Sequence, residues 1–285
     1  MRYLCLLFVV IFPAGLLAQT VCSPESSQRL ERMMMSLKYK DLKAKPINAI
    51  MIEVGQAFMN TPYVEKTLEV EGDEPLVVNL TGLDCTTYLE TVITLSRLAK
   101  MGRLNREDYE KELTYLRYRD GVRDSYPSRL HYFSDWIYEN EQKGIIKDVT
   151  QEAGGIIYPN KPSFMSSNPQ YYPQLANEEF IPLLKENEAA IKDRTYHYIP
   201  KASVQEHEEN IQTGDIIAIT ISMNNLDISH VGIAVNISGR IHLMHASSSA
   251  KKVVISQKPL SEYLMGNKSQ SGIMVCRMMD PEAQN

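Results

Sequence analysis

Apolar residues in the N-terminal two thirds of the chain recur every three or four positions, as they do on the buried face of a helix. The pattern predicts helices over residues 25–42, 47–59 and 86–100, over both ends of 106–143, and over 177–192. The third of these helices is apolar on nearly all sides, which predicts that it is buried. Residues 74–80 predict a short strand, and the Pro- and Asn-rich residues 154–173 predict a long ordered loop.

The pattern changes to strands in the C-terminal third. Short β-branched apolar runs predict strands over residues 215–221, 230–237, 240–246, 252–255 and 272–278. Helices followed by an antiparallel sheet place the chain in the α+β class. We expect one domain over residues 19–285, with a helical part at about 25–200 and a β-rich part at about 211–280.

The first eighteen residues differ from the rest. Arg2 precedes an apolar run that Pro13 and Gly15 interrupt, and the small residue Ala18 closes the segment. The run is too short for a stable membrane span and has the order of a secretory signal peptide, so we expect removal of residues 1–18. A retained anchor and a lipoprotein attached through the following cysteine are weaker alternatives.

Composition and charge exclude one class of partner. The 285 residues include 30 basic and 35 acidic side chains, which gives a net charge of −5. A duplex-binding domain needs a basic excess to neutralise phosphates, so we expect no nucleic-acid partner. Average hydrophobic and charged content predicts a folded protein with no stable membrane insertion.

Cysteine usage singles out one residue. Loss of the signal peptide removes Cys5 and leaves Cys22, Cys85 and Cys276. In an oxidising compartment Cys22 and Cys276 could form a disulfide, which the sequence neither requires nor excludes. Cys85 stands where a buried helix begins, and the unpaired N–H groups of a helix start stabilise a thiolate. Cys85 is therefore the candidate nucleophile.

A cysteine nucleophile needs an imidazole that takes its proton, and three of the six histidines cluster near the C-terminus. If Ser238-Gly239 forms a two-residue hairpin turn, Gly232 faces His245 and leaves room between two rings. His230 then lies diagonally beside His245, while His242 points to the opposite face. We expect His230 to be the base and His245 to orient it. A three-residue turn would exchange the two faces.

Four motifs in this order resemble those of the NlpC-type cell-wall cysteine peptidases, which have a papain-like core. They are Leu83-Asp84-Cys85-Thr86, Thr213-Gly214-Asp215-Ile216-Ile217, Ser229-His230-Val231-Gly232-Ile233 and Met244-His245-Ala246-Ser247. The resemblance implies a nucleophile helix packed on an antiparallel sheet, a Cys85-His230-His245 triad, and no metal or cofactor. Thr61-Pro62-Tyr63 resembles the Thr-x-Tyr element that helps form the oxyanion hole there, although the aromatic-Gly-Gly stretch that usually follows is absent.

The segment from Arg117 to Trp136 is similar to one in the N-acetylmuramoyl-L-alanine amidase-like branch of that superfamily. This resemblance spans about residues 45–278 and implies hydrolysis of the amide between N-acetylmuramic acid and L-alanine in soluble anhydro-muropeptides. Aromatic faces and arginine donors suit a sugar–peptide ligand. The expected substrate-binding residues are Asp84, Arg119, Asp120, Arg129, His131, Tyr132 and Trp136. We expect the extra helices and the long loop to form the substrate cleft.

Three alternatives stay open. An endopeptidase of the same superfamily would cut within the stem peptide, between D-glutamate and diaminopimelate. A zinc amidase would use Cys85, His230 and His245 as ligands, but no ligating carboxylate or short His-x-x-x-His spacing accompanies them. A non-catalytic protein would only bind muropeptides. The signal peptide together with a peptidoglycan substrate suggests the periplasm of a Gram-negative bacterium.

Overall fold

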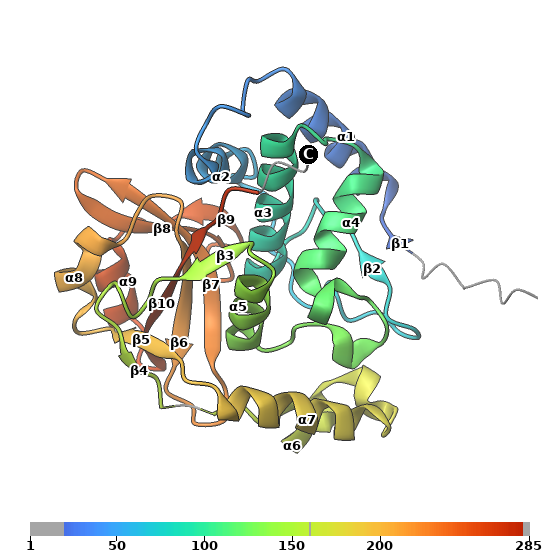
Figure 1. Ribbon diagram of the computed structural model, residues 1–285, viewed down its shortest axis with the longest axis vertical. Coiled ribbons are helices and arrows are strands. Elements are labelled where there is room, and N and C mark those ends of the chain that lie inside the picture. Colours follow the sequence, from blue (N-terminus) through green and yellow to red (C-terminus); the bar gives the residue numbers. More distant parts are fainter. Residues whose placement is uncertain (1–19, 160, 282–285) are drawn as a thin grey trace, which may run out of the picture.

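An antiparallel sheet forms one side of the molecule, and helices cover both of its faces (Figure 1). The computed structural model describes residues 20–159 and 161–281. Within these ranges the sheet has eight strands in the order β4-β5-β10-β6-β7-β8-β9, and β3 pairs with one end of β10. The strands are β3 (Ile146–Asp148), β4 (Ile156–Ile157), β5 (His197–Pro200), β6 (Ile216–Ile221), β7 (Ile228–Ile237), β8 (Arg240–Ser247), β9 (Lys252–Ile255) and β10 (Gln270–Met278).

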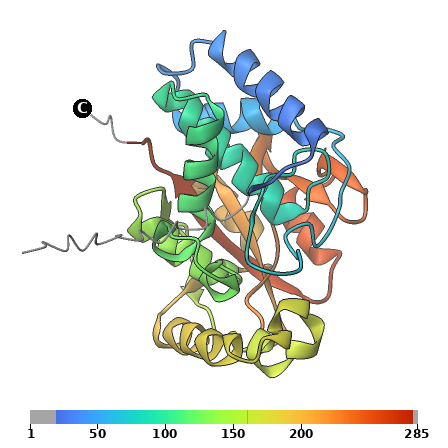
Figure 2. The ribbon, with the colours of Figure 1, turned by 90° about the vertical axis from the view of Figure 1, so that its right-hand side faces the viewer.

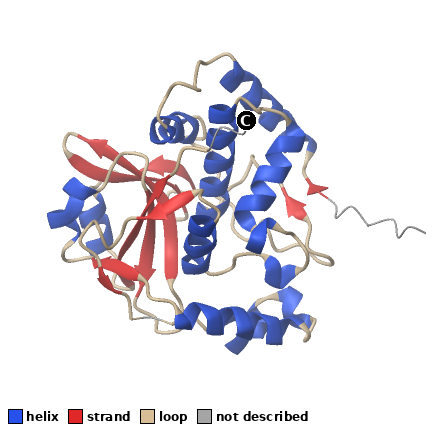
Figure 3. Ribbon diagram, viewed as in Figure 1, coloured by secondary structure: helices blue, strands red, loops and turns tan. Residues whose placement is uncertain are grey.

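The helices lie in groups around this sheet (Figure 3). Helices α2, α3 and α5 stand beside one face with α1 and α4 outside them, α8 and α9 stand beside the other face, and α6 and α7 lie together at one end of the molecule (Figure 2). A separate parallel pair, β1 (Thr20–Val21) and β2 (Leu76–Val77), lies beside α4. The helices are α1 (Pro24–Lys38), α2 (Ile47–Gln56), α3 (Cys85–Met101), α4 (Arg106–Arg117), α5 (Phe133–Gln142), α6 (Phe164–Ser167), α7 (Phe180–Asp193), α8 (Val204–His207) and α9 (Leu260–Met265).

Alternate residues of the central strands face two apolar cores, one on each side of the sheet. On β7, Val231 and Ile233 pack in the core shared with α3, whereas Ala234 packs in the core under α9. All side chains of α3 from residue 87 to residue 99 are buried, which confirms the prediction of a buried helix. Burial of a side chain such as Leu89 stabilises the fold by about 1.5–3 kcal/mol.

A capping box fixes the residue at which α3 begins. The Asp84 carboxylate accepts a hydrogen bond from the Thr87 backbone N–H at 2.8 Å, and the Thr87 hydroxyl accepts one from the Asp84 N–H at 3.0 Å. Such a cap contributes about 1 kcal/mol and satisfies donors that the first helical turn leaves unpaired. Cys85 is therefore the first helical residue, as the sequence predicts.

The predicted two-residue turn between β7 and β8 is present. Both central residues have positive φ, 53° for Ser238 and 85° for Gly239, as a type I′ turn requires. Ile237 consequently pairs with Arg240, and the ladder continues to the pair of Ile233 and Met244. The register of the hairpin is thus the one predicted from the sequence.

The ladder between β7 and β8 ends at that pair, so the predicted pair of Gly232 and His245 is not part of it. Beyond this point β7 stays paired with β6, and β8 stays paired with β9. A Cβ atom at Gly232 would lie 2.8 Å from Leu243 Cδ1 and 2.9 Å from the Met244 carbonyl oxygen. The close approach of Gly232 to β8 therefore requires a glycine at this position.

The sequence pattern missed several short elements. Residues 154–173 contain β4 and α6 in place of a continuous loop, and β3, β5 and α9 were not predicted. The helix expected from residue 177 begins at Phe180, with Pro182 in its first turn, where a missing N–H leaves no hydrogen bond unmade. Elements of two to six residues are too short to show a period.

All three cysteines in the described residues are free, so the structure does not contain the possible disulfide between Cys22 and Cys276. Cys276 is fully buried on β10, where it pairs with Ile216 of β6. Cys22 precedes α1 and lies close to Arg106 of α4. The two thiols occupy separate parts of the fold.

The expected signal peptide, residues 1–18, lies outside the described residues. Among the helices that the structure describes, none has the length and apolar character needed to cross a bilayer.

Candidate active site

Cys85 lies at the point where β7 and β8 separate. The backbone N–H of Val231 and the N–H and hydroxyl of Thr86 lie close enough to its sulfur to lower the pKa of the thiol. The N–H of Val231 reaches the sulfur because β7 has no β8 partner at this residue. The residue before Val231 is His230, so the strand that donates to the sulfur also carries an imidazole beside it.

The two imidazoles selected from the sequence are in direct contact. His230 Nε2 lies 2.5 Å from His245 Nδ1, and the rings meet edge to face, with centroids 4.7 Å apart and planes 86° apart. His245 is buried, with 2% of its surface exposed, whereas His230 is partly exposed. His242 points to the other face, where its Nδ1 lies 2.8 Å from the Ser256 carbonyl oxygen. The predicted sorting of the three histidines is confirmed.

Burial keeps both imidazoles neutral. It lowers the pKa of His230 to about 4 and that of His245 to about 3, and the neighbouring His230 contributes to the second shift. In a neutral pair one nitrogen donates and the other accepts. When His230 donates from Nε2, its Nδ1 keeps a lone pair and His245 carries its own proton on Nε2. This arrangement leaves His230 with a free basic nitrogen.

Burial also raises the pKa of the Cys85 thiol to about 11, and the Asp84 carboxylate adds to the increase. Hydrogen bonds from Val231 and Thr86 act in the opposite direction but do not offset the loss of solvation. The resting thiol is therefore protonated, which differs from the predicted thiolate. The helix start supplies donors to the sulfur, but desolvation is the larger effect.

A cavity of about 150 Å³ opens beside this group. Its walls are Cys85 and Thr86, residues 130–133, Met165 with Tyr172, and residues 226–231. The volume corresponds to roughly five water molecules, so it suits the reacting part of a substrate better than a whole disaccharide. Met165 and Tyr172 come from the segment predicted as a long loop, which therefore contributes to the cleft as expected.

His131 lines this cavity, and the tautomer of its imidazole is fixed. Its Nε2 lies 2.8 Å from the Tyr126 carbonyl oxygen, which only accepts, so Nε2 carries the proton. Burial, with a smaller effect from Arg129, holds the pKa of His131 well below its ordinary value. The ring is therefore neutral, and Nδ1 keeps its lone pair.

Tyr132 also lines the cavity and ties its walls together. Its hydroxyl donates to Glu188 of α7 at 2.7 Å and accepts from the Met165 N–H of α6 at 2.9 Å. Ser166 adds hydrogen bonds to the same carboxylate. The segment that contains α6 and α7 is thereby attached to the cavity wall.

The other five predicted substrate-binding residues do not line this cavity. Asp84 is occupied as the cap of α3. Trp136 has no exposed surface, and its ring stacks on Phe133 with centroids 4.6 Å apart. A group without exposed surface cannot contact a ligand, so the prediction for Trp136 is corrected to a packing role.

Both predicted arginines are paired inside the protein. Arg129 is 5% exposed, lies 2.7 Å from Glu69, and places its guanidinium 4.9 Å from the centre of the Tyr126 ring. Arg119 pairs with Asp135 and Glu139 of α5. Asp120 next to it has a φ of 54° and donates its backbone N–H to the same Glu139 at 3.2 Å. These residues hold the segment that precedes the cavity wall.

Two tyrosines lie near enough to Cys85 for a charge on its sulfur to raise their pKa values. Tyr63, which the sequence selects, donates its N–H to the Lys251 carbonyl at 2.9 Å and forms a bridge with Leu83. Burial and the charge of a Cys85 thiolate raise its pKa to about 12. Tyr263 on α9 was missed, although its ring contacts His245 and the same thiolate charge adds to the effect of burial in raising its pKa.

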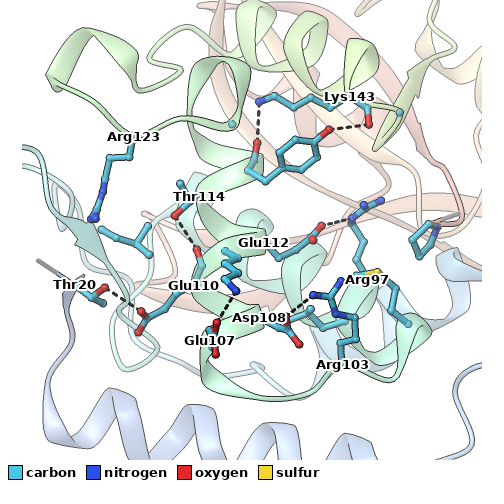
Figure 4. Close-up of a pocket in the computed structure, with 18 of the residues that line it drawn as sticks. Thr20, Arg97, Arg103, Glu107, Asp108, Glu110, Glu112, Thr114, Arg123 and Lys143 are labelled. Atoms are coloured by element: carbon cyan, nitrogen blue, oxygen red, sulfur yellow. Dashed lines mark hydrogen bonds and ion pairs between the residues drawn. The ribbon is translucent and has the colours of Figure 1, made fainter. Parts of the chain in front are cut away.

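A larger cavity of about 970 Å³ lies elsewhere, along α4 (Figure 4). Its charged side chains largely pair with one another, as Arg103 does with Asp108 and Lys111 with Glu107, both at 2.5 Å. Exposed pairs of this kind contribute little energy, and the lining contains no cysteine or histidine. The groups able to carry out acyl transfer lie at the smaller cavity.

Within the described parts of the chain, no three His, Cys, Asp or Glu side chains are placed to hold a metal ion.

The chain has an amidase-like fold. Its antiparallel sheet packs on a buried helix, and the cysteine at the start of that helix lies beside two paired histidines. A family model described as AmiA-like, N-acetylmuramoyl-L-alanine amidase-like, matches residues 53–273. The chain belongs to this family.

Solved structures agree with this assignment. An N-acetylmuramoyl-L-alanine amidase from Bacteroides uniformis is 40% identical, with a TM-score of 0.78 over 82% of this chain and 99% of that one. A Bacteroides fragilis protein provisionally described as a xylanase is 39% identical, with a TM-score of 0.75 over 79% and 99%. A Legionella pneumophila protein shares the fold at 23% identity, with a TM-score of 0.68 over 90% and 95%. A search of curated proteins finds no match.

The neutral resting state can be tested without a substrate. We expect the ultraviolet absorbance of the Cys85 thiolate to be absent at neutral pH and to appear only as the pH approaches about 11, because burial disfavours the anion. The signal is the difference between the wild-type protein and Cys85→Ser, which removes the contribution of the other two thiols. A full thiolate signal at neutral pH would show instead a preformed thiolate–imidazolium pair.

Proposed function

We propose that the chain is a secreted cysteine amidase that hydrolyses the amide between N-acetylmuramic acid, in its anhydro form, and L-alanine in peptidoglycan fragments. The observation that carries the proposal is the 2.5 Å contact between His230 and His245 beside Cys85. Family membership supplies the class of bond and of substrate. The activity in the name of the Bacteroides uniformis relative is the one proposed for this chain.

Acylation begins from the neutral site. Cys85 gives its proton to Nδ1 of His230 while the sulfur attacks the lactyl carbonyl carbon, and the carbonyl oxygen becomes an oxyanion. The backbone N–H of Cys85 and the hydroxyl of Tyr63 donate to this oxygen. The C–N bond then breaks, and His230 passes the proton to the departing amine of L-alanine. A muramoyl thioester remains on Cys85.

Deacylation uses the same groups in reverse. A water molecule gives a proton to His230 and attacks the thioester carbonyl, and the sulfur leaves and recovers that proton. The imidazolium that forms in each step lies in a poorly solvated place. The lone pair of His245 Nδ1 accepts a hydrogen bond from the Nε2–H of His230 and stabilises the positive charge on His230. His245 therefore orients His230 and fixes the tautomer of His230.

His131 and Tyr132 are the predicted substrate-binding residues that line the cavity, and we assign His131 the recognition of a substrate N–H or O–H group. Its Nδ1 is an acceptor whose state is fixed by the Tyr126 carbonyl. An acceptor in the cavity wall selects ligands that carry a matching donor, because a ligand without one leaves a polar atom of the protein unpaired.

The family and the N-terminal sequence support a place of action outside the cytoplasm. A cell-wall amidase acts outside the cytoplasm, and residues 1–18 have the order of a secretory signal. We propose removal of that segment, one catalytic domain over residues 19–285, and the periplasm of a Gram-negative bacterium as the location.

The xylanase description of one relative suggests glycosidic chemistry, which requires two carboxyl groups facing the scissile bond. The cavity beside Cys85 has one carboxylate, Asp227, and its oxygens accept from the Ser134 and Ile228 N–H groups, each at 2.7 Å. The site therefore favours acyl transfer. An endopeptidase that cuts within the stem peptide uses the same chemistry, and the products distinguish the two.

The proposed activity predicts both the products and the dependence on Cys85. Digestion of a defined disaccharide-tetrapeptide should release the free disaccharide and the intact tetrapeptide, as identified by mass spectrometry. Cys85→Ala should lower turnover on the order of 10⁴ to 10⁶-fold, as in other nucleophile–base sets. Cys22→Ala, which changes a thiol away from the cavity, is the matched control and should retain activity. A shortened stem peptide would support the endopeptidase, and an active Cys85→Ala variant would refute the mechanism.

Two amide replacements separate the two nitrogens of His131. His131→Asn places an acceptor near the position of Nδ1, whereas His131→Gln places a donor near that of Nε2. We expect the Gln variant to raise KM by about 5- to 30-fold with the melting temperature kept, because one hydrogen bond to substrate is lost. The Asn variant should keep KM and lose stability. Equal KM values for both variants would exclude the recognition role.

A further inference from the structure

Tyr263 lies on α9, a helix that the sequence pattern does not predict, on the sheet face opposite α3. The helix is firmly placed. Leu260 and Leu264 are fully buried, and the Ser261 hydroxyl donates to Glu208 at 3.0 Å and accepts from Arg240 at 2.9 Å. A side chain on such a helix has a fixed relation to the sheet that carries the two imidazoles.

The Tyr263 ring packs against the imidazole of His245. Their centroids are 5.6 Å apart and their planes 81° apart, an edge-to-face arrangement that is favourable for aromatic pairs. The Tyr263 hydroxyl makes no hydrogen bond to the described residues. The contact that Tyr263 makes with the site is therefore a contact of its ring.

An imidazole has two orientations that are nearly equal in shape but differ in which ring atoms carry protons and lone pairs, so the quadrupole of an edge-to-face aromatic neighbour favours one of them. Rotation by a half turn about χ2 exchanges Nδ1 with a carbon atom, and this torsion has two broad minima. Only one orientation presents the Nδ1 lone pair to His230 Nε2 at the observed 2.5 Å. In the other orientation a C–H group faces the donor, and the proton of His230 is no longer held on Nε2.

We propose that Tyr263 is a positioning residue that holds the His245 ring in the orientation that presents Nδ1 to His230. The kinetic consequence rests on the proposed function, whereas the effect on the ring does not. Tyr263 acts through His245 and has no assigned contact with substrate. Its hydroxyl is dispensable for this role, and its ring is not.

The kinetic test compares two substitutions at this position. Tyr263→Phe keeps the ring and should retain kcat within about twofold. Tyr263→Leu removes the aromatic contact and should lower kcat by roughly 10-fold with KM nearly unchanged, because His245 then populates the unproductive orientation. Met265→Ala, on the same helix at a side chain that is 62% exposed, is the matched control for disturbance of α9 and should behave as wild type.

A second readout needs no substrate. Nitrogen NMR of isotope-labelled histidine should show His245 as a single Nε2–H tautomer in the wild type and in Tyr263→Phe, and as a mixture of tautomers in Tyr263→Leu. An unchanged His245 spectrum in the Leu variant would overturn the proposal. A loss of kcat in the Phe variant as large as in the Leu variant would do the same. Should the wild type release no disaccharide while the Leu variant still changes the His245 spectrum, the proposed function fails and the positioning role stands.

Discussion

The contact between His230 and His245 depends on the hairpin of β7 and β8, whose strands are paired next to the turn and unpaired at the other end. The type I′ turn at Ser238-Gly239 sets the register that brings the two rings to the same face. The loss of pairing beyond Ile233 and Met244 frees the end of β7 for the start of α3. If the hairpin were paired along its whole length, the Val231 N–H would bond to β8 and would not face the Cys85 sulfur. If the strands were not paired at all, no register would hold His230 and His245 next to each other. The site exists because both conditions hold.

Desolvation dominates the electrostatics of this site. It lowers the pKa values of both imidazoles and raises that of the thiol, so all three groups are neutral at rest. In such an environment an ion pair is costly until the substrate supplies an oxyanion and its donors. In the proposed mechanism the proton therefore moves together with formation of the S–C bond. The two rings and the tyrosines near them have to be oriented before the substrate reacts, because a poorly solvated site offers no water to replace a hydrogen bond that a misoriented ring loses.

The local sequence pattern was sufficient to predict much of the fold and to select Cys85, His230 and His245. Helical spacing gave α3 with Cys85 at its start, and the parity of a two-residue turn separated His245 from His242. The arginines and Trp136 were assigned to substrate because the residue types that bind a sugar–peptide also form buried ion pairs and aromatic packing. Only long-range contacts, such as that of Arg129 with Glu69, distinguish the two uses. Tyr263 was missed because six residues of α9 show no period, and the thiol pKa was missed because burial is a property of the assembled site.

The proposed thioester on Cys85 is tested most directly by the mass of the protein during reaction with substrate. Rapid acid quenching of the wild-type protein with anhydro-disaccharide-tetrapeptide, followed by peptide mapping, should show the disaccharide acyl group attached to Cys85 as a thioester. A stem-peptide fragment on that cysteine, an adduct on another residue, or turnover with no adduct at any quench time would contradict it.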